Sequence, residues 1–249
     1  KKLTADVSVA GDEPYLIAST LANVPVIVSE NRIKGIKHLL DYYPDVIIMD
    51  DGFQHRKVKR DVDILTVSAN DRKKCYKLLP WGNLREPLKN IERADLVIYT
   101  KTDNYKLPNI HFNIQLFIKS KYLTSSFIST LVKYDDLGYQ KIPPPDKAIF
   151  AFCGIADSQA FIHSAKELSL QVKGSHFFSD HQDYTDSVIL KLSEQIRANA
   201  IGHVVTTEKD MVKLPSSFLS EFEMYVIKIN IKFEKTSDLI SQIQSTINN

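Results

Sequence analysis

The sequence predicts an α/β protein with mostly parallel strands, arranged as two α/β parts and a two-stranded connector. In the first hundred residues, short uninterrupted apolar runs alternate with helix-like stretches, and a second such alternation begins at residue 148. Continuous apolar strands separated by helices are typical of a parallel sheet that helices cover on both faces. Between the two parts, apolar and polar residues alternate around a Ser/Thr stretch, as in an antiparallel strand pair.

In the first part we expect helices over residues 12–21 and 32–42. Asp12 is a candidate N-cap of the first, with Pro14 in its first turn, and the second has apolar residues at helical spacing. Short apolar runs predict buried strands over residues 24–28, 46–49, 63–67 and 95–99.

The connector should pair residues 112–118 with residues 127–134, followed by a stiff spacer at Pro143–Pro145. In the second part, strands are expected over residues 148–152, 204–206 and 224–229, and a terminal helix over 235–247. The predicted domains are therefore residues 1–110, 111–145 and 146–249.

Composition narrows the range of functions. The 249 residues carry a formal net charge of +2, and no segment concentrates enough Lys and Arg for a phosphate-binding stripe, so we expect no nucleic-acid partner. No run approaches the roughly 18 apolar residues that span a bilayer, so any membrane contact should be peripheral. Cys75 and Cys153 lie too far apart for a metal or redox motif.

Asp50 and Asp51 directly follow the apolar run at 46–49. Carboxylates at the carboxyl end of a buried parallel strand are where α/β nucleotide enzymes hold Mg²⁺. The structural alternative is a turn cap, which Gly52 makes plausible.

Asp12 and His181 are candidates for acid–base chemistry. Asp12 can be a helix N-cap, a general base, or both. His181 lies in a polar cluster between apolar stretches, where a simple loop residue is the alternative interpretation.

Two further segments combine charge with turn residues. Arg85 and Glu86 follow a loop that contains Pro80 and Gly82, which predicts either a site for an anionic or amphipathic substrate or a surface salt bridge. Thr207 with Asp210 resembles a capping box, a sufficient structural explanation.

The start of the chain also bears on function. No G-x-x-x-x-G-K-[ST] phosphate loop occurs in the sequence, and Lys1 is not a Met. We therefore expect an N-terminal part carrying that loop to be missing from these residues.

Taken together, these motifs resemble the lipid A 4′-kinase (tetraacyldisaccharide 4′-kinase) family. The matching segments, in the family's order, are GDEP at 11–14, DDGFQHR at 50–56, LP at 79–80 with GNLREPL at 82–88, AFCGIA at 151–156, DH at 180–181 and TEKD at 207–210. They extend over essentially the whole chain, and DDGFQHR and LREPL are highly specific.

The resemblance implies a P-loop-type parallel-sheet domain, here without its N-terminal phosphate-loop part, and a smaller α/β/α domain joined to it by a two-stranded β connector. It further implies ATP and Mg²⁺ as cofactors. The site residues that it implies are Asp12 as catalytic base with His181 as its partner, Asp50 and Asp51 as metal ligands, Gln54 in the nucleotide site, and Arg85 and Glu86 at the substrate. The sequence departs from the family at Gln182, where a second His often follows.

The activity so implied is phosphorylation of the 4′-hydroxyl of a tetraacylated glucosamine disaccharide 1-phosphate, a lipid A precursor. The enzyme would act as a peripheral protein at the cytoplasmic face of the inner membrane. Two alternatives stay open at this point: another P-loop ATPase or ligase, and a fragment that is inert because the phosphate loop is absent.

Overall fold

The computed structural model describes residues 4–21, 23–69, 76–102, 117, 122–135, 138–234 and 236–247. The chain forms two compact units: a first unit of residues 1–44 and 129–229, and a second unit of residues 45–128 and 230–249. Strands β3 (Tyr122–Asp135) and β8 (Glu223–Phe233) contribute residues to both. The predicted domain boundaries near residues 110 and 145 stay a prediction, and the first of them lies outside the described residues.

The first unit is built on a parallel sheet in the order β8-β7-β5-β6. Its further strands are β5 (Ala148–Cys153), β6 (Gln171–Phe177) and β7 (His203–Thr207). Strand β3 lies beside β8, and β4 (Gly138–Lys141) pairs with β3 in antiparallel orientation. The predicted class, α/β with mostly parallel strands, is confirmed.

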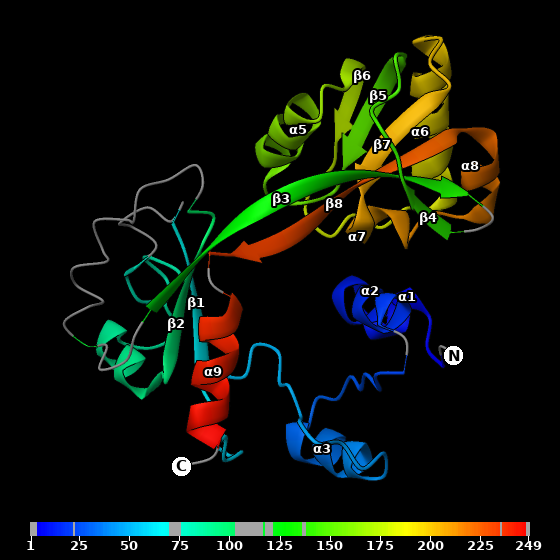
Figure 1. Cartoon of the computed structure of the whole chain (residues 1–249). Helices are drawn as coiled ribbons and strands as arrows, with labels where there is room; N and C mark the ends of the chain where they lie inside the picture. The colour runs from blue at the N-terminus through cyan, green and yellow to red at the C-terminus, as the bar shows by residue number, and fades with distance from the viewer. Residues whose placement is uncertain are drawn as a thin grey trace. The chain divides into compact units, whose positions relative to one another are not determined.

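Helices cover both faces of this sheet (Figure 1), which is why its strands read as continuous apolar runs. Helix α5 (Ser158–Glu167) packs on one face, where Phe161 and Ala165 meet Ile149 and Ala151 of β5. Helices α6 (Asp186–Ala198) and α8 (Ser216–Glu221) pack on the other.

Four short helices complete the first unit: α1 (Val7–Ala10), α2 (Asp12–Thr20), α3 (Arg32–Leu40) and α7 (Glu208–Met211). Gly11 separates α1 from α2 with φ 84° and ψ 153°, a backbone conformation that is essentially open to glycine alone. This turn fixes the direction in which α2 starts, at Asp12. Helix α2 contacts α7, which directly follows β7.

The second unit contains a smaller parallel sheet. Its strands are β1 (Ile64–Ser68), β2 (Leu96–Thr100) and the start of β3, in that order. The 3-10 helix η2 (Leu88–Arg93) packs through Ile91 on Val97 and Tyr99, and α9 (Thr236–Ile247) ends the described chain.

Two of the predicted strands are wrong. Residues 24–28 and 46–49 form no strand, and Val28 and Ile48 are exposed. A strand requires a neighbour for its backbone N–H and C=O groups, and none of the described strands pairs with either segment. Apolar sequence alone could not reveal this. The connector strand predicted over 112–118 lies outside the described residues apart from Phe117.

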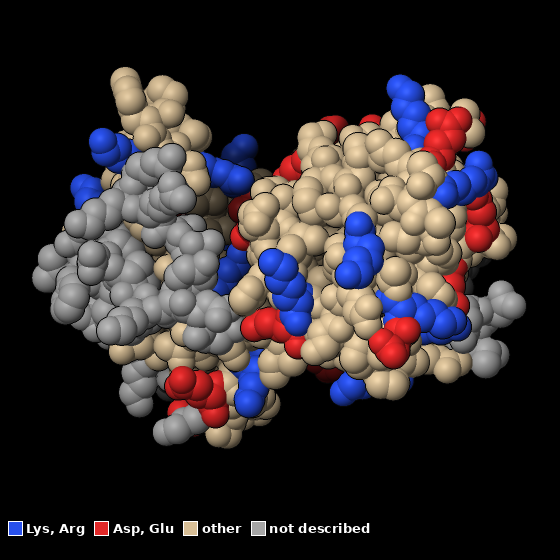
Figure 2. Space-filling model, turned by 90° about the horizontal axis from the view of Figure 1, so that it is seen from above, with Lys and Arg blue, Asp and Glu red and all other residues tan. Residues whose placement is uncertain are grey.

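Charges of both signs are mixed on the face of the first unit that Figure 2 shows. On the face shown in Figure 2, Lys, Arg, Asp and Glu are interspersed over the first unit (right), as a net charge of +2 suggests. None of the helices in the described part of the chain combines the length and apolarity needed to cross a membrane.

The core of the first unit should depend on Phe152, which is fully buried and contacts Phe178, Tyr184 and Phe218 edge to face. Phe152→Ala should lower the free energy of unfolding by about 3–5 kcal/mol, because it removes apolar contacts and leaves a cavity. Urea denaturation measures this. Leu190→Ala, at an exposed position of α6, is the control and should change stability by less than about 0.5 kcal/mol. Equal effects of the two changes would show that the core does not centre on Phe152.

Candidate functional site

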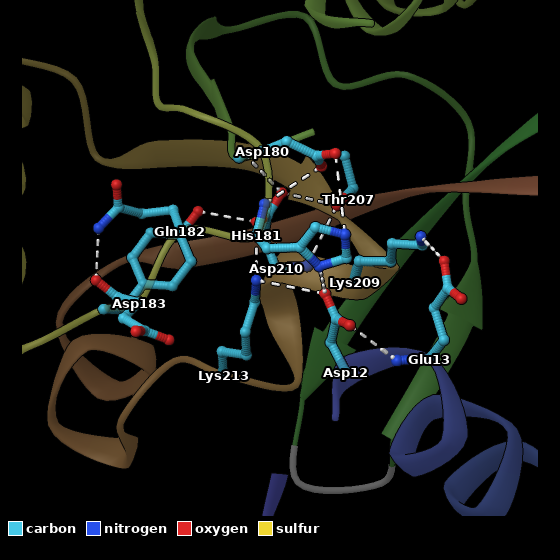
Figure 3. A network of polar contacts seen from close by, with 12 residues as sticks. Asp12, Glu13, Asp180, His181, Gln182, Asp183, Thr207, Lys209, Asp210 and Lys213 are labelled. Atoms are coloured by element: carbon cyan, nitrogen blue, oxygen red, sulfur yellow. Dashed lines mark hydrogen bonds and ion pairs between the residues drawn. The ribbon is translucent and has the colours of Figure 1, made fainter. Parts of the chain in front are cut away.

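Asp12 and His181, the two residues predicted for acid–base chemistry, lie side by side in the first unit (Figure 3). The Nδ1 atom of His181 is 3.2 Å from Oδ2 of Asp12, although 169 positions separate them in the sequence. Asp12 is the first residue of α2 and Gly11 is its N-cap, so the N-cap expected at Asp12 falls one residue earlier. The Oδ1 atom of Asp12 accepts a hydrogen bond of 3.0 Å from the N–H of Glu13.

The loop after β6 places His181. Its backbone has φ 56°, and its N–H donates to the carbonyl of Gly154 at 3.2 Å. The Nε2 atom lies 3.7 Å from Oδ2 of Asp180, so the exposed ring has a carboxylate near each nitrogen. With Nδ1 protonated, the ring donates to Asp12, a geometry that fixes the carboxylate.

A lysine that the sequence reasoning missed completes the surroundings of Asp12. Lys213 Nζ lies 3.6 Å from Oδ2 of Asp12 and 3.7 Å from Oδ1 of Asp210, over the ring of Tyr184. Its position three residues after Asp210 is the one signal that the sequence offers, and that spacing is too common to identify a site.

Asp210 is the fully buried anchor of this region. The predicted capping contact is present, since Thr207 Oγ1 accepts from the N–H of Asp210 at 3.1 Å. The carboxylate in turn accepts from the Gly154 N–H at 3.0 Å, the Tyr184 hydroxyl at 2.9 Å and the Thr207 hydroxyl at 2.7 Å. Asp210 therefore does more than cap a helix: it joins β5, the His181 loop and α7.

Gly154 is required where β5 meets this anchor. A Cβ atom there would lie 2.8 Å from Cβ of Gln182 and 3.1 Å from Oδ1 of Asp210. Only a residue without a side chain allows the His181 loop to approach Asp210 so closely.

The charges around Asp12 determine its ionisation. Burial raises its pKa, but the positive charges of Lys213 and His181 and the N–H of Glu13 more than offset this, so the pKa stays below its ordinary value. Asp12 is therefore a carboxylate at neutral pH. Burial, aided by Asp210, raises the pKa of Cys153 to about 12, which excludes a thiolate nucleophile at this position.

The residues predicted for nucleotide, metal and substrate gather in the second unit. A cavity of ≈ 270 Å³ there is lined by Asp51, Gln54, Arg85 and Glu86 together with apolar residues of β1 and η2. Arg85 donates to Oδ2 of Asp51 at 2.7 Å, and both side chains are more than half exposed. Asp50 is not among the lining residues, and its Oδ1 accepts from the N–H of Asp51.

Glu86 is tightly bound within the protein. Arg93 donates to both of its carboxylate oxygens, at 2.8 and 3.0 Å, and the Asn90 amide adds a bond of 2.7 Å. The Arg93 guanidinium also lies over the ring of Phe53, 4.5 Å from its centroid, and donates to the Phe53 carbonyl. Glu86 thereby fixes residues of the LREPL loop against the DDGF segment.

The carboxylates of Asp50 and Asp51 suit Mg²⁺ chemically. Magnesium prefers oxygen ligands and is commonly held by one or two carboxylates, waters and substrate phosphates. The described residues contain no group of three or more metal-binding His, Cys, Asp or Glu side chains. Two adjacent aspartates can supply one or two such ligands, and waters and a phosphate would supply the rest.

The buried anchor gives a stability prediction. Asp210→Ala should lower the free energy of unfolding by about 3–5 kcal/mol, because it leaves the hydrogen-bond donors of Gly154, Tyr184 and Thr207 without their acceptor. Urea denaturation of the variant measures this. Asp183→Ala, at a neighbouring exposed carboxylate, should have little effect. An Asp210→Ala variant as stable as wild type would rule out the anchoring role.

The Glu86–Arg93 pair gives a pH dependence. The hydrogen bonds from Arg93 hold the pKa of Glu86 below 4.5 despite partial burial. Its contribution to stability is therefore complete above about pH 4.5 and is lost as pH falls through the lowered folded-state pKa. Glu86→Gln should destabilise the protein at neutral pH, and its difference from wild type should shrink as pH falls through the lowered folded-state pKa of Glu86.

Urea denaturation at several pH values measures that difference. The exposed neighbour Glu92, changed to Gln, serves as the control and should show no such trend. A pH-independent difference for Glu86→Gln would mean that the charge of Glu86 does not carry its contribution.

Comparison with known proteins places the chain in a family. Residues 2–248 match the family described as tetraacyldisaccharide-1-P 4′-kinase. Proteins named tetraacyldisaccharide 4′-kinase are 37% identical over 210 residues in Chlorobaculum parvum and 35% identical over 235 residues in Aquifex aeolicus. These alignments cover 82% and 92% of this chain, and 58% and 67% of those proteins.

A solved structure of a related protein supports the same family. The crystal structure of LpxK from Aquifex aeolicus in complex with ATP has a TM-score of 0.71 and 32% identity, and the match covers 98% of this chain and 71% of that one. The chain spans about six tenths of the length of several curated relatives, 58% to 63% in three of them. On this evidence, the chain belongs to the tetraacyldisaccharide-1-phosphate 4′-kinase family.

Proposed function

We propose that the protein containing this chain transfers the γ-phosphoryl group of ATP to the 4′-hydroxyl of a tetraacylated glucosamine disaccharide 1-phosphate, giving lipid IVA. The observation that carries this proposal is the pair formed by Asp12 and His181, with an ionised carboxylate 3.2 Å from an imidazole nitrogen. Membership of the family, and relatives named as 4′-kinases, support the choice of reaction.

Asp12 is the proposed general base. As the acceptor oxygen bonds to the γ-phosphorus, the bond between that phosphorus and the β–γ bridging oxygen breaks, and its electron pair leaves with ADP. The hydroxyl proton passes to the Asp12 carboxylate. His181 holds that carboxylate in place, because its Nδ1 atom faces Oδ2 of Asp12.

The pocket of the second unit is the proposed place for nucleotide and metal. Mg²⁺ held by Asp50 and Asp51 would offset the charge of the phosphate oxygens. Gln54 lines the same pocket as Asp51 and would contact the bound nucleotide. This proposal implies a finer description of the fold. The sheet would be of the P-loop type, and its phosphate-loop part is not among these residues.

Arg85 and Glu86 stay the proposed substrate-site residues, with different tasks. The guanidinium of Arg85 is exposed and can exchange Asp51 for an anionic group of a substrate. Both oxygens of Glu86 are bonded to Arg93, so we propose that Glu86 acts by keeping the loop of Arg85 in place.

The acceptor proposed here is a lipid. We therefore propose that the enzyme works as a peripheral protein at the cytoplasmic face of the inner membrane.

Changing the acid–base pair tests the proposal. Asp12→Ala and His181→Ala, made in the protein that contains this chain, should each lower the turnover number by about 10²–10⁴-fold, because the acceptor proton loses its base or the base loses its support. Transfer of radiolabelled γ-phosphate from ATP to the disaccharide measures the rate, and mass spectrometry of the product locates the phosphate at the 4′ position.

His163→Ala is the control, since His163 lies exposed on α5 and pairs with Glu167. Thermal unfolding of each variant should stay close to wild type. Wild-type turnover in both site variants would contradict the assignment, and phosphate released to water without labelled disaccharide would favour an ATPase.

A further inference from the structure

Lys213 is far more buried than Lys209, another lysine near Asp12. Its side chain is 10% exposed, between Asp12 at 13% and Asp210 at 0%. The nearby pair of Lys209 with Glu13 is 36% and 50% exposed, a setting in which ion pairs contribute little. Lysine is almost never buried without a partner, and Lys213 has two, the carboxylates of Asp12 and Asp210.

We infer that Lys213 is a positioning residue, whose ammonium group, seated between Asp210 and Asp12, holds the Asp12 carboxylate in line with His181. This inference rests on the proposed function, in which Asp12 is the base. Figure 3 shows Lys213 and His181 approaching the same carboxylate.

Asp210 and Tyr184 determine where the Lys213 side chain lies. Asp210 already accepts three hydrogen bonds, from Gly154, Tyr184 and Thr207, and is fixed by them. Lys213 Nζ lies 3.7 Å from that carboxylate and 5.5 Å from the centroid of the Tyr184 ring. Since the anchor is rigid and buried, it holds the ammonium group at its distance of 3.6 Å from Asp12.

Charged groups face Asp12 from three segments of the first unit. Asp210 and Lys213 face it from the α7 side, His181 and Asp180 from the loop after β6, and Glu13 with Lys209 lie beside it on α2 and α7. Of these groups, Lys213 and His181 are the two whose charges lower the pKa of Asp12 against its burial, Lys213 the more strongly. Without Lys213, only His181 and the N–H of Glu13 would offset that burial.

The geometry also assigns separate tasks to the two Asp12 oxygens. Lys213 and His181 both approach Oδ2, whereas Oδ1 accepts the single N–H of Glu13 among the described residues. A carboxylate oxygen offers two acceptor positions, so Oδ1 has one for the acceptor hydroxyl. Lys213 therefore contributes orientation as well as charge.

Three variants of the protein that contains this chain test the inference: Lys213→Met, Lys213→Arg and Arg197→Met. Arg197 forms an ion pair with Glu221 in the same unit and makes no contact with Asp12 in the structure, so its variant is the matched control. The first readout is the Asp12 carboxyl titration by carbon-13 NMR, assigned by comparison with Asp12→Asn. The second is the pH profile of kcat/KM for transfer to the disaccharide.

In Lys213→Met, the Asp12 pKa should rise by about one unit and the acid limb of the pH profile should move up with it. Turnover at neutral pH should fall about tenfold or more through loss of alignment. Lys213→Arg should keep the low pKa and recover part of the rate, whereas Arg197→Met should match wild type in both readouts. A purely structural lysine would change stability and leave the Asp12 titration unmoved.

An unchanged Asp12 titration in Lys213→Met would overturn the inference. If that variant does not fold, the titration of wild type and Lys213→Arg decides: an Asp12 carboxyl that titrates at or above about 3.9 in either contradicts it. Failure of the proposed function looks different, because wild type would then transfer no phosphate to the disaccharide, while the NMR titration would still report on Lys213.

Discussion

The Asp210 carboxylate has no exposure to water, and a buried charge is costly unless several donors satisfy it. Here the donors come from three separate segments: the Gly154 N–H at the end of β5, the Tyr184 hydroxyl in the loop after β6, and the Thr207 hydroxyl at the start of α7. Satisfying one charge therefore fixes the carboxyl ends of neighbouring parallel strands relative to one another. The carboxyl edge of a parallel sheet is also where α/β proteins place their ligands.

The arrangement around Asp12 follows from that constraint. The loop held by Gly154 and Tyr184 carries His181, and α7, held through Thr207, precedes Lys213. Helix α2, which starts abruptly at Gly11, brings Asp12 against both of them. The exposed pair of Lys209 with Glu13 adds a second tie between α7 and α2. A site assembled from distant segments thus depends on one buried carboxylate that does not touch the predicted base.

Some strands and the local contact of Asp210 could be predicted from the sequence, whereas strand pairing and long-range hydrogen bonds could not. Strand β5 was predictable because a run with helices on both faces must be apolar throughout. The runs at 24–28 and 46–49 looked the same, but burial depends on a neighbouring strand, which is not a local property. Asp210 was read as a cap because that contact is local, whereas its bonds to Gly154 and Tyr184 span 56 and 26 positions.

In the second unit, Arg85 and Glu86 are neighbours in sequence but belong to two ion pairs of different character. Arg93 and Glu86 are partly buried and meet through two hydrogen bonds, and Arg93 also lies over the ring of Phe53, so the pair is built into the fold. Arg85 and Asp51 meet through one bond and are each more than half exposed, a setting worth about 0–1 kcal/mol. A weak pair that lines a pocket can be exchanged at little cost for an anion on the arginine and a cation on the aspartate. In the proposed site, Arg85 can therefore change its partner, while Glu86, bonded to Arg93, holds the loop that carries Arg85.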